Sequence, residues 1–183
     1  IGGVNIPVKN VEAETVTAVK PTGGDGSSAN PYQITSEANL VWMREEVLDN
    51  NSSKLNAKLM NDITITSDNW QRIGNNVDGK RYNDTFDGDG HTIYNLKYQG
   101  QTGSNISVDA YGGLFGSISD TGVIQNLTIG TATLKGGYAA GAVVAYNSGI
   151  VLNCQVKDSI VRPETIAGGV CSQNTGKILY CSI

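Results

Sequence analysis

The hydrophobic and polar positions of this chain repeat with an offset of 27 residues over its last third. Residues 122–129 read Gly-Val-Ile-Gln-Asn-Leu-Thr-Ile, residues 149–156 read Gly-Ile-Val-Leu-Asn-Cys-Gln-Val, and residues 176–183 read Gly-Lys-Ile-Leu-Tyr-Cys-Ser-Ile. A fainter copy lies 31 residues before the first, at 93–98. Self-similarity at a fixed period is typical of proteins built from stacked structural repeats.

Each copy predicts a bend in the chain. Ile124 and Ile129 are five residues apart, so side-chain alternation cannot place both on one face of a straight strand. A corner at Asn126 lets Ile124 point inward before the bend, and Leu127 and Ile129 point inward after it. Asn tolerates the left-handed backbone conformation that such a corner needs.

The corner asparagines predict a ladder along the stack. If the copies lie directly above one another, Asn95, Asn126 and Asn153 stack with about 4.8 Å between turns. Stacked Asn side chains can hydrogen-bond along the axis. We therefore expect these three residues to form a structural corner ladder.

A second half-repeat lies upstream of each late copy. Residues 113–116, 142–145 and 169–172 run small, apolar, apolar, small, and Asn-Ser-Gly or Asn-Thr-Gly turns follow the last two. We expect two short strands per copy. One repeat cannot bury its apolar side, whereas stacked repeats share one core. The pattern predicts an all-β, right-handed parallel β-helix of about five rungs, and it favours this solenoid over a β-sandwich, which needs two-residue hairpin loops between longer strands.

The two ends of the solenoid differ in sequence. Residues 36–49 predict a single N-terminal capping helix, with Ser36 as N-cap and Leu40, Met43 and Val47 on one face. Residues 1–22 predict an extended arm on the solenoid or a linker, and residues 23–183 the parallel β-helix. The repeat is still running at Ile183, so we expect the C-terminal end to be truncated and further rungs or domains of the same gene product to follow.

Composition excludes some partners. Charged residues make up 16% of the chain, the net charge is −4, and no segment clusters Lys and Arg. Nucleic acid requires a basic surface to neutralise phosphates, so we expect no nucleic-acid partner. No apolar run reaches the ~18 residues of a membrane span, so we expect no direct membrane insertion.

Several segments resemble a known repeat. Gly113-Leu114-Phe115-Gly116 is similar to the GLUG motif, and the Asn-Ser-Gly turn at 147–149 with Asn-Cys at 153–154 matches its usual continuation. The opening at 24–34 and the stretch at 85–93 are also similar to such proteins. This resemblance implies a right-handed β-helix on exported, adhesin-like bacterial proteins, or a non-catalytic part of larger secreted peptidases. It implies no catalytic residues.

The sequence offers no convincing catalytic or metal site. Polysaccharide-cleaving β-helices need carboxylates that converge on one groove, and the predicted outward columns at 94/125/152/179 and 97/128/155/182 contain none. Residues 87–91, Asp-Gly-Asp-Gly-His, read as a tight turn rather than a Ca²⁺ loop or a catalytic pair, because further ligands are missing. Cys154 and Cys181 share an inward column, where parallel side chains approach poorly for a disulfide. We expect buried thiols, no metal and no cofactor.

One outward strip could make contact with another segment. Tyr94, Gln125, Leu152 and Leu179 are expected in register, which places an apolar strip on a polar wall. We expect the N-terminal arm to cover this strip, with a partner as the alternative. Surface tyrosines could stack on sugar rings, and the candidates are Tyr82, Tyr94, Tyr111, Tyr138 and Tyr146.

The sequence therefore favours a non-catalytic module of an exported bacterial cell-surface protein, structural or adhesive, with a glycan or a host surface protein as the expected partner. Its location would be extracellular or on the outer-membrane surface, with a lipid anchor in the full-length protein as one option. The alternatives are a polysaccharide-active β-helical lyase or glycoside hydrolase, and a passive spacer within a larger secreted protein. Fold alone cannot choose among them.

Overall fold

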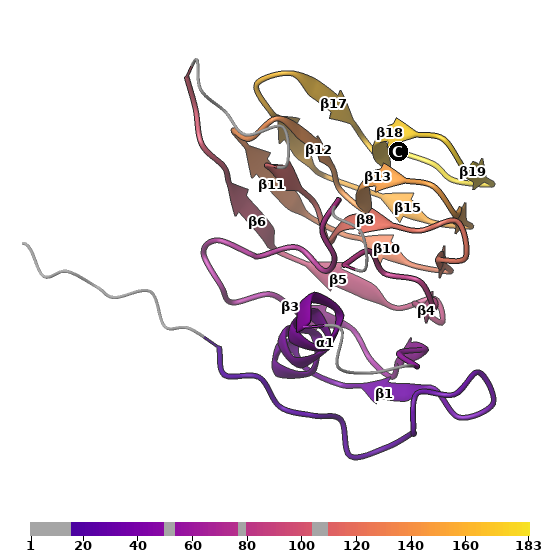
Figure 1. Ribbon diagram of the computed structural model, residues 1–183. Coiled ribbons are helices and arrows are strands. Elements are labelled where there is room, and N and C mark those ends of the chain that lie inside the picture. The colour runs from indigo at the N-terminus through magenta and orange to yellow at the C-terminus, as the bar shows by residue number, and fades with distance from the viewer. Residues whose placement is uncertain (1–15, 50–53, 77–79, 104–109) are drawn as a thin grey trace, which may run out of the picture.

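The computed structural model describes residues 16–49, 54–76, 80–103 and 110–183. One helix and many short strands make up this part of the chain (Figure 1). The elements in chain order are β1 (Tyr32–Ile34), α1 (Glu37–Asp49), β2 (Ala57–Leu59), β3 (Ile63–Thr64), β4 (Thr85–Asp87), β5 (Thr92–Tyr94), β6 (Leu96–Gln99), β7 (Tyr111–Gly112), β8 (Phe115–Ile118), β9 (Val123–Gln125), β10 (Thr128–Ile129), β11 (Ala132–Lys135), β12 (Ala139–Gly141), β13 (Val144–Asn147), β14 (Ile150–Leu152), β15 (Gln155–Val156), β16 (Ile160–Arg162), β17 (Ile166–Gly168), β18 (Cys171–Asn174) and β19 (Lys177–Leu179).

The strands stack into parallel sheets that run along the axis of a β-solenoid. The longest sheet has the order β1-β2-β4-β9-β14-β19, and shorter sheets have the orders β15-β10-β5-β3, β16-β11-β6, β17-β12-β7 and β18-β13-β8. Every strand pairing given for the described residues is parallel. The predicted all-β solenoid with one N-terminal helix is therefore confirmed, and Figure 1 shows the turns stacked from α1 toward the C-terminal end.

A complete turn contains five short strands rather than the two predicted per repeat. One turn runs from β4 to β8, the next from β9 to β13, and the next from β14 to β18. Strands of two to four residues escaped prediction because so few residues cannot establish an alternation. The solenoid cross-section therefore has more corners than the sequence indicated.

The 27-residue offset predicts the register of the late turns correctly. Ile150 pairs with Val123 on one side and with Lys177 on the other. The second half-repeat is also confirmed, because Val144 pairs with both Phe115 and Cys171. Equal turn lengths bring equivalent positions directly above one another.

The predicted 31-residue offset of the early copy is wrong. Phe86 pairs with Ile124, and Ile93 pairs with Ile129, so the preceding turn is offset by 38 residues in one sheet and by 36 in the next. Asn95 therefore does not lie above Asn126. It turns the next corner, where its backbone N–H donates to the Thr131 hydroxyl at 2.7 Å.

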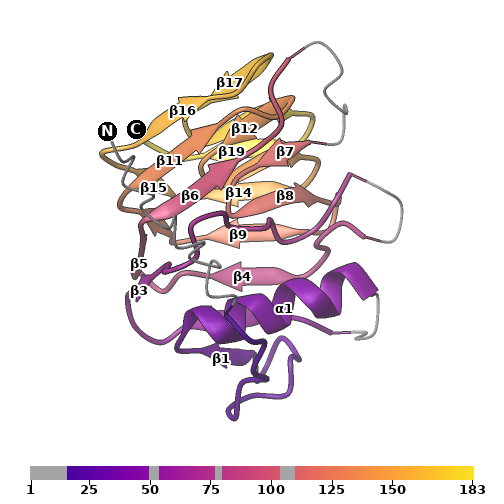
Figure 2. The ribbon, with the colours of Figure 1, turned by 90° about the vertical axis from the view of Figure 1, so that its left-hand side faces the viewer.

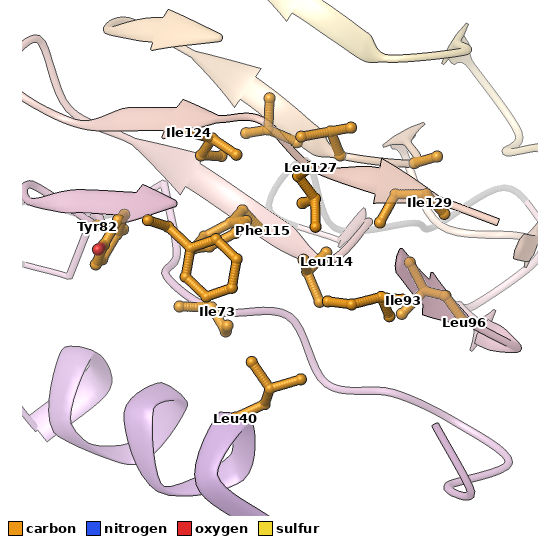
Figure 3. Packing of buried hydrophobic residues seen from close by; sticks show 14 of the residues in the cluster. Leu40, Ile73, Tyr82, Ile93, Leu96, Leu114, Phe115, Ile124, Leu127 and Ile129 are labelled. Carbon is orange, nitrogen blue, oxygen red and sulfur yellow. The ribbon is translucent and has the colours of Figure 1, made fainter. Parts of the chain in front are cut away.

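Aromatic rings fill the middle of the solenoid (Figure 3). The ring of Phe115 lies 5.2 Å from that of Tyr82 and 5.3 Å from that of Phe86. Tyr82, one of the predicted surface tyrosines, is fully buried, and its hydroxyl donates to the Leu55 carbonyl at 2.9 Å. That hydrogen bond lets a phenol lie in an apolar core without an unsatisfied polar group.

The helix α1 crosses the N-terminal end of the stack beside β1 (Figure 2). Ser36 caps it, since its hydroxyl accepts from the Asn39 N–H at 3.3 Å and its carbonyl accepts from Leu40 N–H. Leu40, Met43 and Val47 are buried against the first turn. The predicted cap is thus confirmed, and it closes an end whose strand edges and core would otherwise meet water.

The described part of the N-terminal arm packs on this cap. Val19 N–H donates to the Ala38 carbonyl at 3.0 Å, and the Asn39 side-chain amide donates to the Val19 carbonyl at 2.8 Å. Val16 and Ala18 pack against the main core. Residues 16–22 therefore bind to α1, contrary to the prediction that the arm covers the outward strip; residues 1–15 lie outside the described chain.

Candidate functional site: the outer walls and corners

Two of the three predicted ladder residues stack on each other. The Asn153 side-chain amide donates to the Asn126 Oδ1 at 2.9 Å, and both residues have the left-handed backbone expected of a corner, with φ of 50° and 53°. Asn95 has the same conformation, with φ of 60°, but its side-chain amide donates to the Ile65 carbonyl at 2.7 Å. Its corner chemistry was predicted correctly and its place in the stack was not.

The place next to Asn126 in the stack belongs to the acidic turn. The Asn126 amide donates to Asp87 Oδ1 at 3.0 Å, and the Gln125 amide donates to Asp87 Oδ2 at 2.9 Å. Asp89 N–H also donates to Asp87 Oδ1, and the Asp89 carboxylate pairs with Lys58 at 3.0 Å. Burial alone would raise the pKa of Asp87, but these hydrogen bonds outweigh it and the pKa is lowered. Asp87 is therefore an ionised structural group that closes the corner.

A carboxylate thus does lie in the outward column that was expected to lack one. The column runs Lys58, Asp87, Gln125, Leu152, Leu179. No second carboxylate occupies it, and within the described residues no group of three or more His, Cys, Asp or Glu side chains is arranged to hold a metal. The nearest further acid, Asp62, accepts from Thr92 N–H and lies 3.4 Å from His91 Nδ1.

The predicted apolar strip is present only in its later part. Gln125, Leu152 and Leu179 pair in register, as expected. Tyr94 is displaced with Asn95, and its ring lies against Gly130 instead. Leu152 is half-buried and Leu179 is 41% exposed. The strip is therefore short.

A different wall carries outward side chains that can bind a ligand. On the sheet β6-β11-β16, Leu134 and its neighbours point inward, and the alternate positions point out. One outward column contains Gln99, Lys135 and Arg162 in register, and the adjacent column contains Lys97, Thr133 and Ile160. We call the residues of these two columns the basic wall.

Two recesses lie at the basic wall. One, of about 190 Å³, is lined by Asp68, Lys97, Tyr98, Gln99, Thr133 and Lys135. The other, of about 410 Å³, is lined by Asn69, Gln71, Arg72, Tyr98, Gln99, Gly100, Gln101 and Ala110. They share Tyr98 and Gln99 and are therefore neighbours. Their side chains are mainly amides and cations, which suit an oxygen-rich ligand.

Segment 68–71 is held against β6 by side chains that imitate a strand. Asn69 accepts from Gln99 N–H at 2.9 Å and donates to the Gln99 carbonyl at 3.3 Å. Asp68 pairs with Lys97 at 3.0 Å. The rim of the recesses is thus fixed by hydrogen bonds and an ion pair.

Aromatic residues collect at a neighbouring corner. The rings of Tyr111 and Tyr138 lie 6.4 Å apart, and the Arg81 guanidinium lies 5.3 Å from the Tyr146 ring centre. Tyr111 is only 4% exposed, while Tyr138 and Tyr146 are half-buried. Buried or mutually packed rings present little face to a sugar, so these predicted stacking residues mainly stabilise the outer corner.

The cysteines are free thiols. Cys154 and Cys181 occupy one column as predicted, with Cys154 N–H 3.4 Å from Cys181 Sγ. Burial raises the pKa of Cys154 to about 12 and that of Cys171 to about 11. Neither is a nucleophile near neutral pH, because nucleophilic attack requires the thiolate.

Comparison with known proteins yields two relatives in sequence. The chain is 33% identical over 137 residues to Halomucin of Haloquadratum walsbyi, a match covering 69% of this chain and 1% of that protein. It is 30% identical over 113 residues to a protein of Evansella cellulosilytica provisionally named a Gly-rich membrane protein, covering 58% of this chain and 12% of that one. The chain thus spans a small part of either relative, and no family model matches it.

A solved structure shares the fold. The chain superimposes on a protein of Bacteroides ovatus provisionally named an immunoglobulin A1 protease, with a TM-score of 0.62, 23% identity, and coverage of 88% of this chain and 50% of that one. At this identity the likeness concerns the fold alone. In the described part of the chain, α1 is too short and too polar to cross a bilayer.

Proposed function

We propose that this chain is a non-catalytic module of a cell-surface protein and that it adheres to extracellular polysaccharide through an outer wall of the solenoid. The names of the two sequence relatives, one of them a membrane protein, support a surface or membrane-associated setting. The resemblance of residues 113–116 to GLUG repeats of exported, adhesin-like proteins fits the same setting.

The observation that carries the proposal is that the most acidic corner is fully committed to structure. Asp87 accepts from the side chains of Gln125 and Asn126 and from Asp89 N–H. A general acid must hold a proton near the working pH and must reach the substrate, whereas Asp87 is ionised and surrounded by donors. The basic wall, by contrast, presents amides, a hydroxyl and cations to solvent, which is the chemistry of binding.

Binding without cleavage is the expected result. The purified chain would be incubated with soluble and insoluble polysaccharides of neutral and acidic type, and both its retention and the appearance of new reducing ends or unsaturated sugars would be measured. Retention without product supports the proposal. Product formation that Asp87→Asn removes would establish the enzymatic alternative, and no retention on any polysaccharide would leave the spacer role.

Surface exposure has its own test. Brief proteolysis of intact cells that make the full-length protein should remove the epitopes of this module while a cytoplasmic marker stays intact. Protection of the module in intact cells and its cleavage only after lysis would contradict a surface location.

A further inference from the structure

Two like charges lie side by side on the basic wall. Lys135 and Arg162 are register partners on β11 and β16, both point outward, and both are exposed. Neighbouring strands are about 4.8 Å apart, and like charges directly opposite each other destabilise a sheet. No carboxylate among the described residues lies within ion-pairing distance of either cation.

Lys97 extends this positive charge toward the recesses. It lies one strand away on β6, two residues before the partner of Lys135, and the two lysines line the same recess. Its ammonium group is held by Asp68 at 3.0 Å. Three of the 13 Lys and Arg residues of a chain with net charge −4 thus meet on one wall.

The recesses beside these cations offer neutral hydrogen-bonding groups. Thr133 and Gln99 lie between Lys97 and Lys135, and Gln71 and Gln101 line the larger recess. Hydroxyl and amide groups both donate and accept hydrogen bonds, as recognition of a polyol requires. Among the described residues, the Tyr98 hydroxyl and the Gln101 side chain have no hydrogen-bond partner.

We propose that the basic wall is the binding site for an acidic polysaccharide, whose carboxylate or sulfate groups pair with Lys135 and Arg162 while its hydroxyls bond to the amides and Thr133. This rests on the proposed adhesive function and specifies its ligand class. An anion between the two cations would remove the repulsion that the bare wall contains. Nucleic acid fits less well, because its bases need exposed aromatic platforms and Tyr98 is 6% exposed.

Affinity measurements with polygalacturonate, dextran sulfate and uncharged dextran test this assignment. We expect one or both acidic polymers to bind with an affinity that falls as salt rises, and dextran to bind at least about tenfold more weakly. The two acidic polymers distinguish a carboxylate from a sulfate as the recognised group. A single-stranded oligonucleotide that binds more tightly than either would overturn the polysaccharide assignment.

A charge-reversal pair locates the site. Lys135→Glu with Arg162→Glu should weaken binding to the acidic polymer by at least about tenfold, since each cation makes a charge-assisted contact. The matched control, Lys54→Glu with Lys177→Glu, changes the net charge equally at exposed positions on another sheet and should retain most of the affinity. Equal losses in both pairs would overturn the assignment to this wall.

The outcomes also separate this inference from the function on which it rests. If the chain is retained on dextran and the wall variants leave that retention unchanged, the adhesive role stands and the basic wall is wrong. If no polysaccharide retains the chain, both fall. Should the reversal pair fold poorly by circular dichroism, Lys135→Gln with Arg162→Gln replaces it and should still lose several-fold affinity.

Discussion

The side-chain amide of Asn153 donates a hydrogen bond of 2.9 Å to Oδ1 of Asn126, one full turn of 27 residues earlier. The Asn126 amide in turn donates to Asp87. Three successive turns are thereby joined at one corner by side chains whose backbones could not turn there with an ordinary residue. This corner is where the solenoid register can be tested most directly.

Replacing Asn126 should separate the two roles of this residue. Asn126→Ala loses the hydrogen bonds to Asp87 and from Asn153 and forces Ala into φ of 53°, so the free energy of unfolding should fall by about 2–3 kcal/mol. Asn126→Gly keeps the backbone and should cost about 1 kcal/mol. Urea unfolding measures both. Equal effects of the two variants would show that the backbone conformation contributes little.

Tyr180 occupies the corner position of the following turn and is strained there. Its φ is 54° and its side chain is 86% exposed, so the ring gains little while the backbone carries the cost of the left-handed region. Tyr180→Asn should raise stability by about 1 kcal/mol. Slower amide hydrogen exchange in β19 is the readout. Tyr180→Ala removes the ring but keeps the strain, and a matching gain in that variant would contradict the explanation.

Gly149 is required because the neighbouring turn approaches too closely for a side chain. A Cβ there would lie 2.1 Å from the Gly122 carbonyl oxygen and 2.5 Å from that of Ser119. Backbone atoms cannot yield without parting the turns, so Gly149→Ala should cost at least about 2–3 kcal/mol. Gly90→Ala is the control, since no atom lies within 4 Å of its Cβ position, and it should cost about 1 kcal/mol. Similar urea midpoints for the two variants would contradict close stacking.

Acid should loosen the capping helix through Glu37. This carboxylate is only 7% exposed and accepts from the N–H and hydroxyl groups of Thr66 and Ser67. Burial would raise its pKa, but the hydrogen bonds prevail and lower it below the ordinary 4.5. The unfolded chain therefore binds the proton more readily, so this stabilisation is complete above about pH 4.5 and is lost as pH falls through the folded pKa.

The measurement is urea unfolding between neutral pH and about pH 3. The wild type should lose stability across the acid range, and Glu37→Gln should be less stable at neutral pH with a flatter acid dependence. Asp87, whose pKa is also lowered, contributes in the same direction and remains in the variant. An unchanged acid slope in Glu37→Gln would contradict this role.

The thiol of Cys154 should react only when the solenoid opens. Its pKa is raised to about 12 and it is fully buried. In a variant that keeps Cys154 and carries Cys171→Ser and Cys181→Ser, a disulfide reagent should titrate no thiol in the native protein at neutral pH and one thiol in urea. Rapid native labelling would show that this column is accessible to solvent.

The sequence by itself determined the solenoid and the register of its late turns. Turns of equal length convert a repeat in sequence into a stack in space, which is why the pairing of Val123, Ile150 and Lys177 could be predicted from the 27-residue offset. The capping helix was equally visible, because Ser36 and the buried face of α1 are local signals. The left-handed corners followed from the chemistry of Asn.

Only the tertiary structure decided which residues meet across turns of unequal length. The extra residues between Phe86 and Ile124 are placed in corners and loops by long-range pairing, and no local pattern fixes how many enter each one. Asn95 therefore moved to another corner, and Gln99, Lys135 and Arg162 came into register. The basic wall was invisible in sequence because its cations are separated by whole turns, and a solenoid brings such residues together one strand apart.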